Sequence, residues 1–384
     1  MLTFDMDFQK LKNEIIEYSK TIGIDKIGFT TANTFSEMKN LLIRQEMLGY
    51  QSGFEEKDID KRVDPSLIFD QPRSIIAIAL AYPSRMENAP RSKKGERRGI
   101  FCRASWGQDY HDVLRNRLQK LEEYISSKVP DAKFKSMVDT GELVDRAVAE
   151  RAGIGWSGKN CAIITPEFGS YVYLGEMITN LPFEPDEPMT DQCGTCNKCV
   201  DVCPTGALVE GGQLDAGKCI AFLTQTKGFL PDKYRTKLGN RLYGCDTCQT
   251  VCPENKRKDF HIHEEMEPDP ELVKPLLKPL LTITNRDFKE KYGKMSGSWR
   301  GKKPIQRNAI IALAHYKDDT AIDELITVMK KDVRPVMRGT AAWAIGKIGH
   351  EQGFSALIEA KNVEKDKEVL AEINKGLKLL EEQK

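Results

Sequence analysis

Two cysteine runs decide the fold in the middle of the chain: CGTCNKCVDVCPTGAL from Cys193 to Leu208, and CDTCQTVCPEN from Cys245 to Asn255. The first run has the spacing Cys-x2-Cys-x2-Cys-x3-Cys-Pro of bacterial ferredoxins, in which the fourth cysteine ligates the other of two 4Fe–4S clusters. The second run is the same motif with one cysteine fewer, and Cys219 lies between the runs. We therefore predict two 4Fe–4S clusters with four thiolate ligands each.

The crossover rule assigns the eight thiolates to two sets. The first cluster takes Cys193, Cys196, Cys199 and Cys252. The second takes Cys203, Cys219, Cys245 and Cys248. Structural zinc is an alternative for two CxxC pairs, but zinc does not require the Cys-Pro that closes both runs. Disulfides are a further alternative, and they suit small secreted chains rather than a long one that starts without a signal peptide.

Length and composition indicate an ordinary intracellular protein. The chain has 384 residues, 40% hydrophobic and 30% charged, which leaves room for two or three domains. No apolar run reaches the roughly 18 residues of a membrane span. Ten cysteines with iron–sulfur spacing indicate a reducing compartment, so we expect a cytoplasmic location. A net charge of +1 means that any nucleic-acid binding depends on local basic patches.

Apolar periodicity predicts alternating helices and strands before the cysteine runs. Helices are expected at 8–22, 35–50, 112–129 and 143–153, and strands at 23–30, 73–83 and 133–140. The segment CAIITPEFGSYVYLGEMIT, residues 161–179, is expected to form a β-hairpin. The pattern is typical of an α/β or α+β domain.

After Trp299 an apolar pattern recurs at an offset of 32 residues. Ile305, Met337 and Val369 begin three copies of the i, i+4, i+7, i+8 spacing of a buried helix face. Paired helices at this period are typical of HEAT-like repeats. The overall prediction is a multidomain α+β chain with an N-terminal domain at 1–185, a ferredoxin-like domain at 186–262, a linker or helical connection at 263–298 and helical repeats at 299–384.

Basic residues gather at the repeat starts and between the cysteine runs. A solvated face is one explanation, and contact with nucleic-acid phosphates is the other. The candidates at the repeats are Arg300, Lys302, Lys303, Arg307, Arg334 and Arg338. The candidates in the insertion at 222–240 are Lys227, Lys233, Arg235 and Lys237.

No second redox cofactor has a legible motif. The chain lacks a dinucleotide-binding glycine fingerprint. The cobalamin motif DxHxxG is also not met, because Asp109-Tyr110-His111 is followed by Leu114 where glycine is needed. A bare electron carrier would leave most of the chain without a role.

The segment VDTGELVDRAVAERAGIGWSGKN, residues 138–160, together with the paired runs, Cys219 and the repeats, resembles the epoxyqueuosine reductase family over essentially the whole chain. That family is related to corrinoid iron–sulfur reductive dehalogenases. The resemblance implies base-off cobalamin in an α/β N-terminal domain, and clusters that feed it electrons from an external low-potential donor. The implied substrate is tRNA, whose wobble epoxyqueuosine becomes queuosine in the last step of queuosine biosynthesis. We expect a monomer.

The resemblance also implies residue roles. Asp139 stands where the family has its general acid, and a carboxyl covered by a corrin should have a raised pKa. Taken alone, such an aspartate is a turn or cap residue. Arg62, Cys102, Gly158 and Lys159 are implied cobalamin contacts, although Cys102 also suits a buried apolar site. Cys161 is expected to be structural.

Two other functions stay open. One is a corrinoid iron–sulfur reductase of a small halide or epoxide, which would need neither the repeats nor the basic helix starts. The other is a non-catalytic electron-transfer adaptor that docks a protein through the repeats. Cobalamin binding separates the adaptor from both enzymes, and salt-dependent tRNA binding separates the two enzymes.

Overall fold

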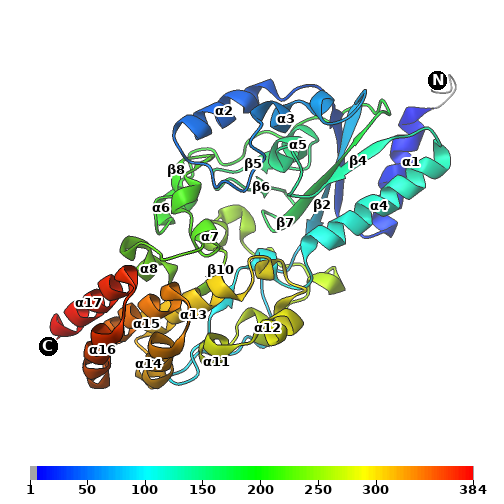
Figure 1. Cartoon of the computed structure of the whole chain (residues 1–384). Coiled ribbons are helices and arrows are strands. Elements are labelled where there is room, and N and C mark those ends of the chain that lie inside the picture. Colours follow the sequence, from blue (N-terminus) through cyan, green and yellow to red (C-terminus); the bar gives the residue numbers. More distant parts are fainter. Residues whose placement is uncertain (1–6, 384) are drawn as a thin grey trace. The chain divides into compact units, whose positions relative to one another are not determined.

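The computed structural model describes residues 7–383, which divide into two compact units (Figure 1). Unit 1 comprises the chain up to Arg85, Gln108–Cys219 and Asp246–Glu267. Unit 2 comprises Met86–Gly107, Ile220–Cys245 and the chain from Pro268 onward. Both units are therefore discontinuous in sequence, whereas the sequence suggested four contiguous ranges.

Unit 1 is built on a four-stranded antiparallel sheet with the order β1-β2-β7-β4. The strands are β1 (Lys26–Thr31), β2 (Ser74–Ala81), β4 (Phe134–Met137) and β7 (Val172–Thr179). All eight residues of β2 are buried, as expected for an apolar β-branched run in a central strand. The strands predicted at 23–30, 73–83 and 133–140 are confirmed as β1, β2 and β4.

Helices cover both faces of this sheet (Figure 1). One face packs against α4 (Tyr110–Lys128), which in turn packs against α1 (Phe8–Thr21). The other face packs against α5 (Asp145–Arg151). Every apolar position expected on the core side of α4, such as Leu114 and Leu118, is buried. The remaining helices of unit 1 are α2 (Ser36–Met47), α3 (Ile59–Val63), α6 (Lys198–Val202) and α9 (Thr247–Thr250).

The predicted hairpin at 161–179 is wrong. Strand β6 (Ile163–Ile164) pairs with β5 (Trp156–Ser157), while β7 lies between β2 and β4. A bridge between Thr165 and Gly169 turns the chain between β6 and β7. Apolar patterning cannot distinguish these pairings, because it marks buried strands and not their neighbours. A separate short ribbon is formed by β8 (Leu208–Glu210) and β9 (Gln213–Leu214).

Unit 2 contains the helical repeats. Its helices from the repeat region are α13 (Lys302–Tyr316), α14 (Ile322–Lys331), α15 (Pro335–Ile348), α16 (Glu351–Val363) and α17 (Lys367–Glu381). Ile305, Met337 and Val369 are buried, as the 32-residue offset predicts. Helices α15 and α17 approach closely because Gly376 has no side chain: a Cβ there would lie 2.5 Å from the carbonyl oxygen of Ala342.

The rest of unit 2 packs onto these repeats. A parallel pair joins β3 (Ile100–Phe101) and β10 (Arg241–Tyr243). The other helices are α7 (Ile220–Leu223), α8 (Asp232–Leu238), α10 (Pro270–Val273), α11 (Leu277–Thr282) and α12 (Asn285–Tyr292). Residues 263–298 are thus largely helical, and Leu277, Leu280 and Phe288 belong to the same buried core as the repeats. Within residues 7–383, no helix has both the length and the apolar character needed to cross a membrane.

Candidate functional site

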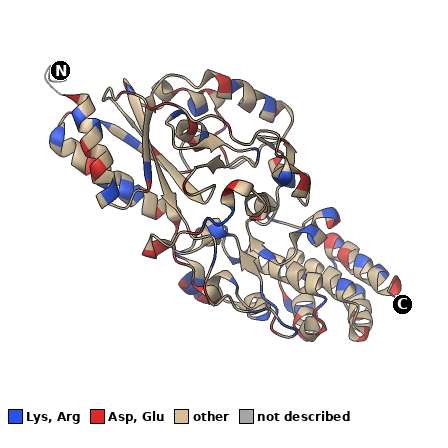
Figure 2. Cartoon of the chain, turned by 180° about the vertical axis from the view of Figure 1, so that it is seen from behind, with Lys and Arg blue, Asp and Glu red and all other residues tan. Residues whose placement is uncertain are grey.

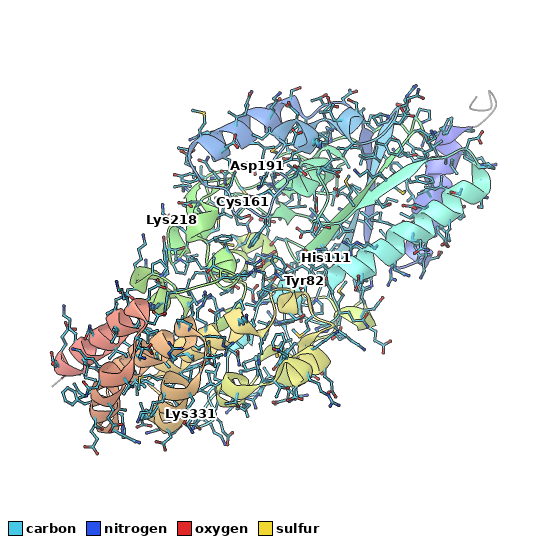
Figure 3. The ribbon with its side chains drawn as sticks, viewed as in Figure 1. Tyr82, His111, Cys161, Asp191, Lys218 and Lys331 are labelled. Carbon is cyan, nitrogen blue, oxygen red and sulfur yellow. The ribbon has the colours of Figure 1, made fainter. Side chains whose placement is uncertain are left out.

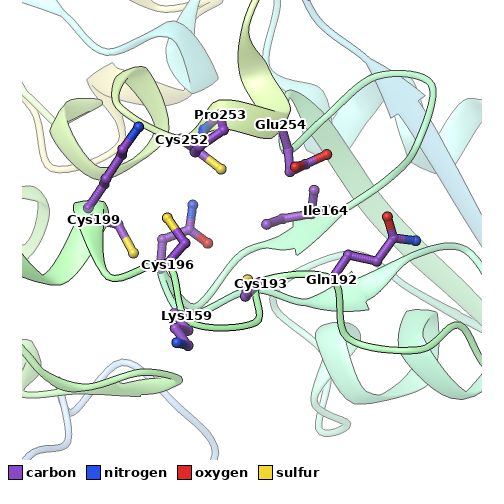
Figure 4. Close-up of a pocket in the computed structure, with 11 residues that line it drawn as sticks. Lys159, Ile164, Gln192, Cys193, Cys196, Cys199, Cys252, Pro253 and Glu254 are labelled. Carbon is purple, nitrogen blue, oxygen red and sulfur yellow. The ribbon is translucent and has the colours of Figure 1, made fainter.

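The four cysteines assigned to the first cluster line one pocket of unit 1. Figure 4 shows the side chains of Cys193, Cys196, Cys199 and Cys252 around a common space. Cys193 and Cys196 lie in the loop that leads into α6, Cys199 lies in the first turn of α6, and Cys252 follows α9. None of the ten cysteines, all within the described residues, forms a disulfide, so the disulfide alternative is wrong.

The pocket is held in place by polar contacts with the sheet domain of unit 1. Lys159 Nζ donates to the carbonyl oxygen of Gly194 at 2.6 Å and to Asn197 Oδ1 at 3.0 Å, which fixes the loop of the first three ligands. Asn255, three residues after Cys252, is buried and donates to Ser170 Oγ at 2.8 Å. The motif Cys-Pro-Glu-Asn is therefore anchored to the loop before β7.

Three of the four residues assigned to the second cluster lie in unit 1: Cys203, Cys219 and Cys248. The backbone N–H of Ala207 donates to Cys203 Sγ at 3.3 Å. Burial acts to raise the pKa of Cys203, but this N–H and those of Leu208 and Thr205 bring the pKa below that of an ordinary thiol. Cys245 is the last residue of a unit 2 segment.

Asp139 begins the turn after β4 and has an unusual backbone. Its φ is +55°, in the left-handed region that non-glycine residues rarely adopt. Its backbone N–H donates to Asp145 Oδ2 at 2.9 Å, and its side chain is 61% exposed. The turn therefore presents a carboxylate to solvent while Asp145 holds the backbone behind it.

His111, in the first turn of α4, is the partner of this carboxylate (Figure 3). Its Nε2 lies 3.3 Å from Asp139 Oδ2, and its Nδ1 lies 2.6 Å from Asp109 Oδ1. Burial lowers the pKa of His111, but hydrogen bonds to Asp109 and Asp139 outweigh it and raise the pKa to about 9. At neutral pH His111 is an imidazolium that donates from both ring nitrogens.

The raised pKa expected for Asp139 beneath a corrin stays a prediction, whereas in the protein chain by itself the shift has the opposite direction. The hydrogen bond from His111 lowers the pKa of Asp139, and it outweighs burial, which acts to raise it. The sequence argument considered burial alone. It did not include a cation, because His111 is 28 residues away in the chain.

A buried pair of carboxyl groups lies behind the Asp139 turn. Glu176, on the central strand β7, is 1% exposed, and burial followed by repulsion from Asp145 raises its pKa well above the usual value. Burial and the charge of Asp139 raise the pKa of Asp145 to about 6. The raised pKa of Glu176 favours its protonated form, which donates a hydrogen bond to Asp145.

The other predicted cobalamin contacts are distributed as follows. Arg62 lies in α3, half-buried and within electrostatic reach of Asp145. Gly158 and Lys159 lie in the turn after β5, and Lys159 lines the cluster pocket. Cys102 follows β3 in unit 2, with its Sγ 3.7 Å from Ser105 Oγ. Their contacts with cobalamin stay predictions.

Two of the basic residues proposed for RNA binding are corrected. Arg307 is 1% exposed, and its guanidinium donates to the carbonyl oxygens of Leu223 and Gly228 at 2.9 Å each. Arg235 is also 1% exposed and forms a two-point ion pair with Glu372 at 2.5 and 2.9 Å. Neither side chain reaches a phosphate.

The remaining basic candidates differ in exposure. Lys227, Lys233, Lys237 and Lys303 are exposed, whereas Arg300 and Lys302 are half-buried. Arg334 pairs with Asp332 and Arg338 with Glu364. Basic and acidic residues are interspersed on the C-terminal helices (Figure 2).

Sequence reasoning missed His111, Asp145, Glu176 and Asn160. Two of them carried a usable signal: Glu176 is the one charged residue of the strand VYLGEMIT, and His111 follows an aspartate at a helix start. Asp145 and Asn160 are unremarkable in sequence, and their roles depend on what the fold places beside them.

Three family models match the chain. The model for epoxyqueuosine reductase QueG, DUF1730, matches residues 62–140. A 4Fe-4S double cluster binding domain matches residues 192–255, which confirms the iron–sulfur assignment over zinc. HEAT repeats match residues 301–378.

Known proteins match over the full length. Epoxyqueuosine reductase from Bacillus anthracis is 72% identical over 99% of this chain and 100% of that protein. The Escherichia coli protein of the same name is 30% identical over 97% and 98%. A crystal structure of an epoxyqueuosine reductase with an epoxyqueuosine-modified tRNA-Tyr stem loop has a TM-score of 0.96 and 69% identity, covering 98% of this chain and 100% of the other. Matches of this identity and coverage show that the chain belongs to the epoxyqueuosine reductase family.

Proposed function

We propose that this chain reduces epoxyqueuosine in tRNA to queuosine. In that reaction both C–O bonds of an epoxide break, an alkene forms and the oxygen leaves as water. The change consumes two electrons and two protons. The protein therefore has to deliver electrons singly from its clusters and a proton to the departing oxygen.

One observation carries the proposal. Unit 1 contains both a four-thiol cluster pocket and an exposed carboxylate paired with an imidazolium. An electron carrier alone would need only the first. The presence of both features in unit 1, together with the similarity to proteins named epoxyqueuosine reductase, favours an enzyme over an electron-transfer adaptor.

Asp139 and His111 account for one of the two protons. His111 Nε2–H donates to Asp139 Oδ2, so a proton that passes along this bond arrives on an exposed carboxyl oxygen. A leaving oxygen within hydrogen-bond reach of that carboxyl takes the proton there. A structure of the Bacillus subtilis enzyme, 68% identical with a TM-score of 0.95, is described with the loop of a catalytic aspartate swung out of its active site. This description supports a catalytic role for the Asp139 turn.

Cobalamin is the proposed terminal cofactor. When bound, it would supply a cobalt centre that exchanges single electrons with the clusters and acts on the epoxide. One feature of the structure fits a base-off form: both ring nitrogens of His111 are bonded to carboxylates, so the histidine of Asp109-Tyr110-His111 offers no nitrogen to cobalt. Arg62 and the Asp139 turn are the residues of unit 1 that we propose to hold it.

The proposed partners follow from the substrate. The tRNA would contact exposed lysines of unit 2, foremost Lys227 and Lys303, with Arg300 and Lys302 beside them. Arg334 and Arg338 reach RNA only by giving up their acidic partners. We further propose a cytoplasmic monomer that receives electrons from a low-potential donor protein.

The direct test is anaerobic turnover of the cluster-loaded protein with cobalamin, a low-potential reductant and an RNA anticodon stem-loop that carries epoxyqueuosine. The expected result is loss of one oxygen mass from the nucleoside, dependent on cobalamin. Asp139→Ala should keep iron and cobalamin but lose roughly a hundredfold or more in kcat. Asp131→Ala, an exposed aspartate elsewhere on unit 1, is the control. No oxygen loss with clusters and cobalamin loaded would overturn the proposal.

A further inference from the structure

Asn160 lies at the first-cluster pocket but has no assigned role. It lines the pocket together with Cys193, Cys196, Cys199 and Cys252. The side chain is 7% exposed, so water does not satisfy it from outside. Its amide nitrogen Nδ2 has no hydrogen-bond partner within the described part of the chain.

The orientation of this amide is fixed by the turn that carries it. Asn160 Oδ1 accepts the backbone N–H of Ala162 at 3.2 Å. The turn is closed by the N–H of Gly158, which donates to the Ala162 carbonyl oxygen at 2.8 Å. Rotating the amide by half a turn would place its NH2 against the Ala162 N–H, donor against donor. The oxygen therefore faces the turn, and the nitrogen is left for another acceptor.

Buried N–H groups in native proteins almost always have a partner. Lys159 cannot be that partner, because its ammonium group only donates hydrogen bonds, here to the Gly194 carbonyl oxygen and to Asn197 Oδ1. The pocket that Asn160 lines is the one that the 4Fe-4S domain match assigns to an iron–sulfur cluster. Sulfur atoms of such a cluster accept N–H hydrogen bonds, and these bonds help set its reduction potential.

We infer that Asn160 Nδ2 donates an N–H···S hydrogen bond to the first cluster and makes that cluster easier to reduce. Adding one electron makes the cluster sulfur atoms more negative, so the bond stabilises the reduced form more than the oxidised form. A similar contact exists at the second ligand set, where the Ala207 N–H lies 3.3 Å from Cys203 Sγ. The inference depends on the cluster assignment and not on the identity of the RNA substrate.

The first measurement is pulsed electron paramagnetic resonance on the reduced holoprotein labelled with 15N-asparagine. We expect a 15N coupling to the first cluster that disappears in Asn160→Asp. That variant keeps an oxygen for the Ala162 N–H and has a carboxylate oxygen in place of the amide NH2, so it has no side-chain nitrogen to couple to the cluster. A wild-type spectrum without an asparagine coupling overturns the inference, whatever the variants do.

The second measurement is a redox titration of Asn160→Leu, which fills similar space without polar atoms. At a fixed potential we expect the reduced-to-oxidised ratio of the first cluster to fall roughly tenfold, which is about 59 mV for a one-electron couple, and that of the second cluster to be unchanged. Ile164→Val, another pocket-lining residue, controls for packing. An unshifted first cluster overturns the inference; if Asn160→Leu fails to load iron, Asn160→Asp and the wild-type coupling decide. Inactivity of a wild type that shows the coupling would count against the proposed function alone.

Discussion

At Asp139 the backbone conformation itself marks a functional position. A non-glycine residue at positive φ costs about 1–3 kcal/mol and persists only where its surroundings fix it. Here the hydrogen bond from the Asp139 N–H to Asp145 offsets part of that cost. Asp145 is in turn bonded to protonated Glu176, which is surrounded by the apolar face of β7. The carboxyl pair of Asp145 and Glu176 therefore holds the backbone of the Asp139 turn, while His111 lowers the pKa of the Asp139 carboxyl.

The His111 pair predicts a pH dependence of turnover. With a pKa of about 9, His111 is charged at neutral pH and loses its proton as the pH rises through 9. The kcat of the wild type should therefore fall across that range, because the cation that donates to Asp139 is lost. His111→Gln should have a kcat lower by roughly a hundredfold and no such fall. The measurement is kcat from pH 6 to 10, with iron content checked at each pH.

His261→Gln is the matched control for this titration. His261 also has a raised pKa, owing first to its hydrogen bond with Glu267, but it has no contact with Asp139 in the described structure. Its variant should keep the wild-type profile. A wild-type kcat that is flat up to pH 10 would show that the charge of His111 plays no part.

Glu176 predicts a pH-dependent stability. Its folded pKa lies above the unfolded value near 4.5, so the folded state binds more protons than the unfolded state at higher pH. The free energy of unfolding therefore falls as the pH rises from 4.5 towards the folded pKa. Glu176→Gln stays neutral and keeps a donor for Asp145. Its Tm relative to wild type should be higher at pH 8 than at pH 5, measured by anaerobic thermal unfolding.

Glu142→Gln should show the opposite pH response: its Tm relative to wild type should be lower at pH 8 than at pH 5. Burial acts to raise the pKa of Glu142, but its ion pair with Lys135 lowers it below the usual value. That carboxylate contributes stability above its unfolded pKa, and the variant loses this contribution at pH 8. Equal pH responses of the two variants would contradict the assignment of a protonated Glu176.

At the scale of one element, α13 shows why basic residues in a repeat helix are not interchangeable. Its first turns carry Lys303, which is exposed, and Arg307, which is buried. The next residue, Asn308, donates to the carbonyl oxygens of Thr224 and Leu242 at 2.8 Å each. Arg307 and Asn308 of α13 therefore donate hydrogen bonds to backbone carbonyl oxygens in and around α7 and β10.

Substitutions of Arg307 and Lys303 should have separable effects on stability and on RNA binding. Arg307→Ala leaves several buried carbonyl oxygens without a donor and should lower the free energy of unfolding by roughly 3 kcal/mol or more. Lys303→Ala should change stability by less than about 0.5 kcal/mol. It should instead weaken binding of the RNA stem-loop and reduce its salt dependence. Tm and stem-loop binding at two salt concentrations measure both effects, and an RNA defect in folded Arg307→Ala equal to that of Lys303→Ala would contradict this division.

At the scale of the whole molecule, the two units are interwoven along the chain. Two points at which the chain passes from one unit to the other are cysteines assigned to the second cluster, Cys219 and Cys245. The cluster assignment thus concerns segments that are far apart in sequence. Iron content is the direct measure of it.

Cys219→Ser should remove the second cluster and spare the first. The iron content should fall from about eight to about four atoms per chain, the difference of one 4Fe–4S cluster. Cys161→Ser, a half-buried cysteine outside both runs, should keep the wild-type content. Unchanged iron in Cys219→Ser would show that the assignment of three ligands from the runs plus Cys219 is wrong.

Much of this protein is determined by the sequence itself. The cysteine spacing predicts the iron–sulfur domain, because ligand geometry requires thiols at those intervals. The continuous apolar run predicts β2 as a strand buried on both faces, and the period-3.6 pattern predicts α1, α4 and the repeats, because burial of one helix face imposes that period along the chain. The segment 138–160 identifies the family. Such features are local, so a short stretch contains the information they need.

What the tertiary structure decided concerns pairs of residues that are distant in sequence. It placed His111 beside Asp139, so that in the protein chain by itself the pKa of Asp139 is lowered. It buried Arg307, whose sequence neighbours Lys302 and Lys303 point to a solvated basic helix start. It also brought Asn160 to the cluster pocket, where the amide nitrogen Nδ2 has no hydrogen-bond partner among the described residues. Charge, burial and hydrogen bonding depend on what the fold places next to each group, and no spacing rule along the chain records that.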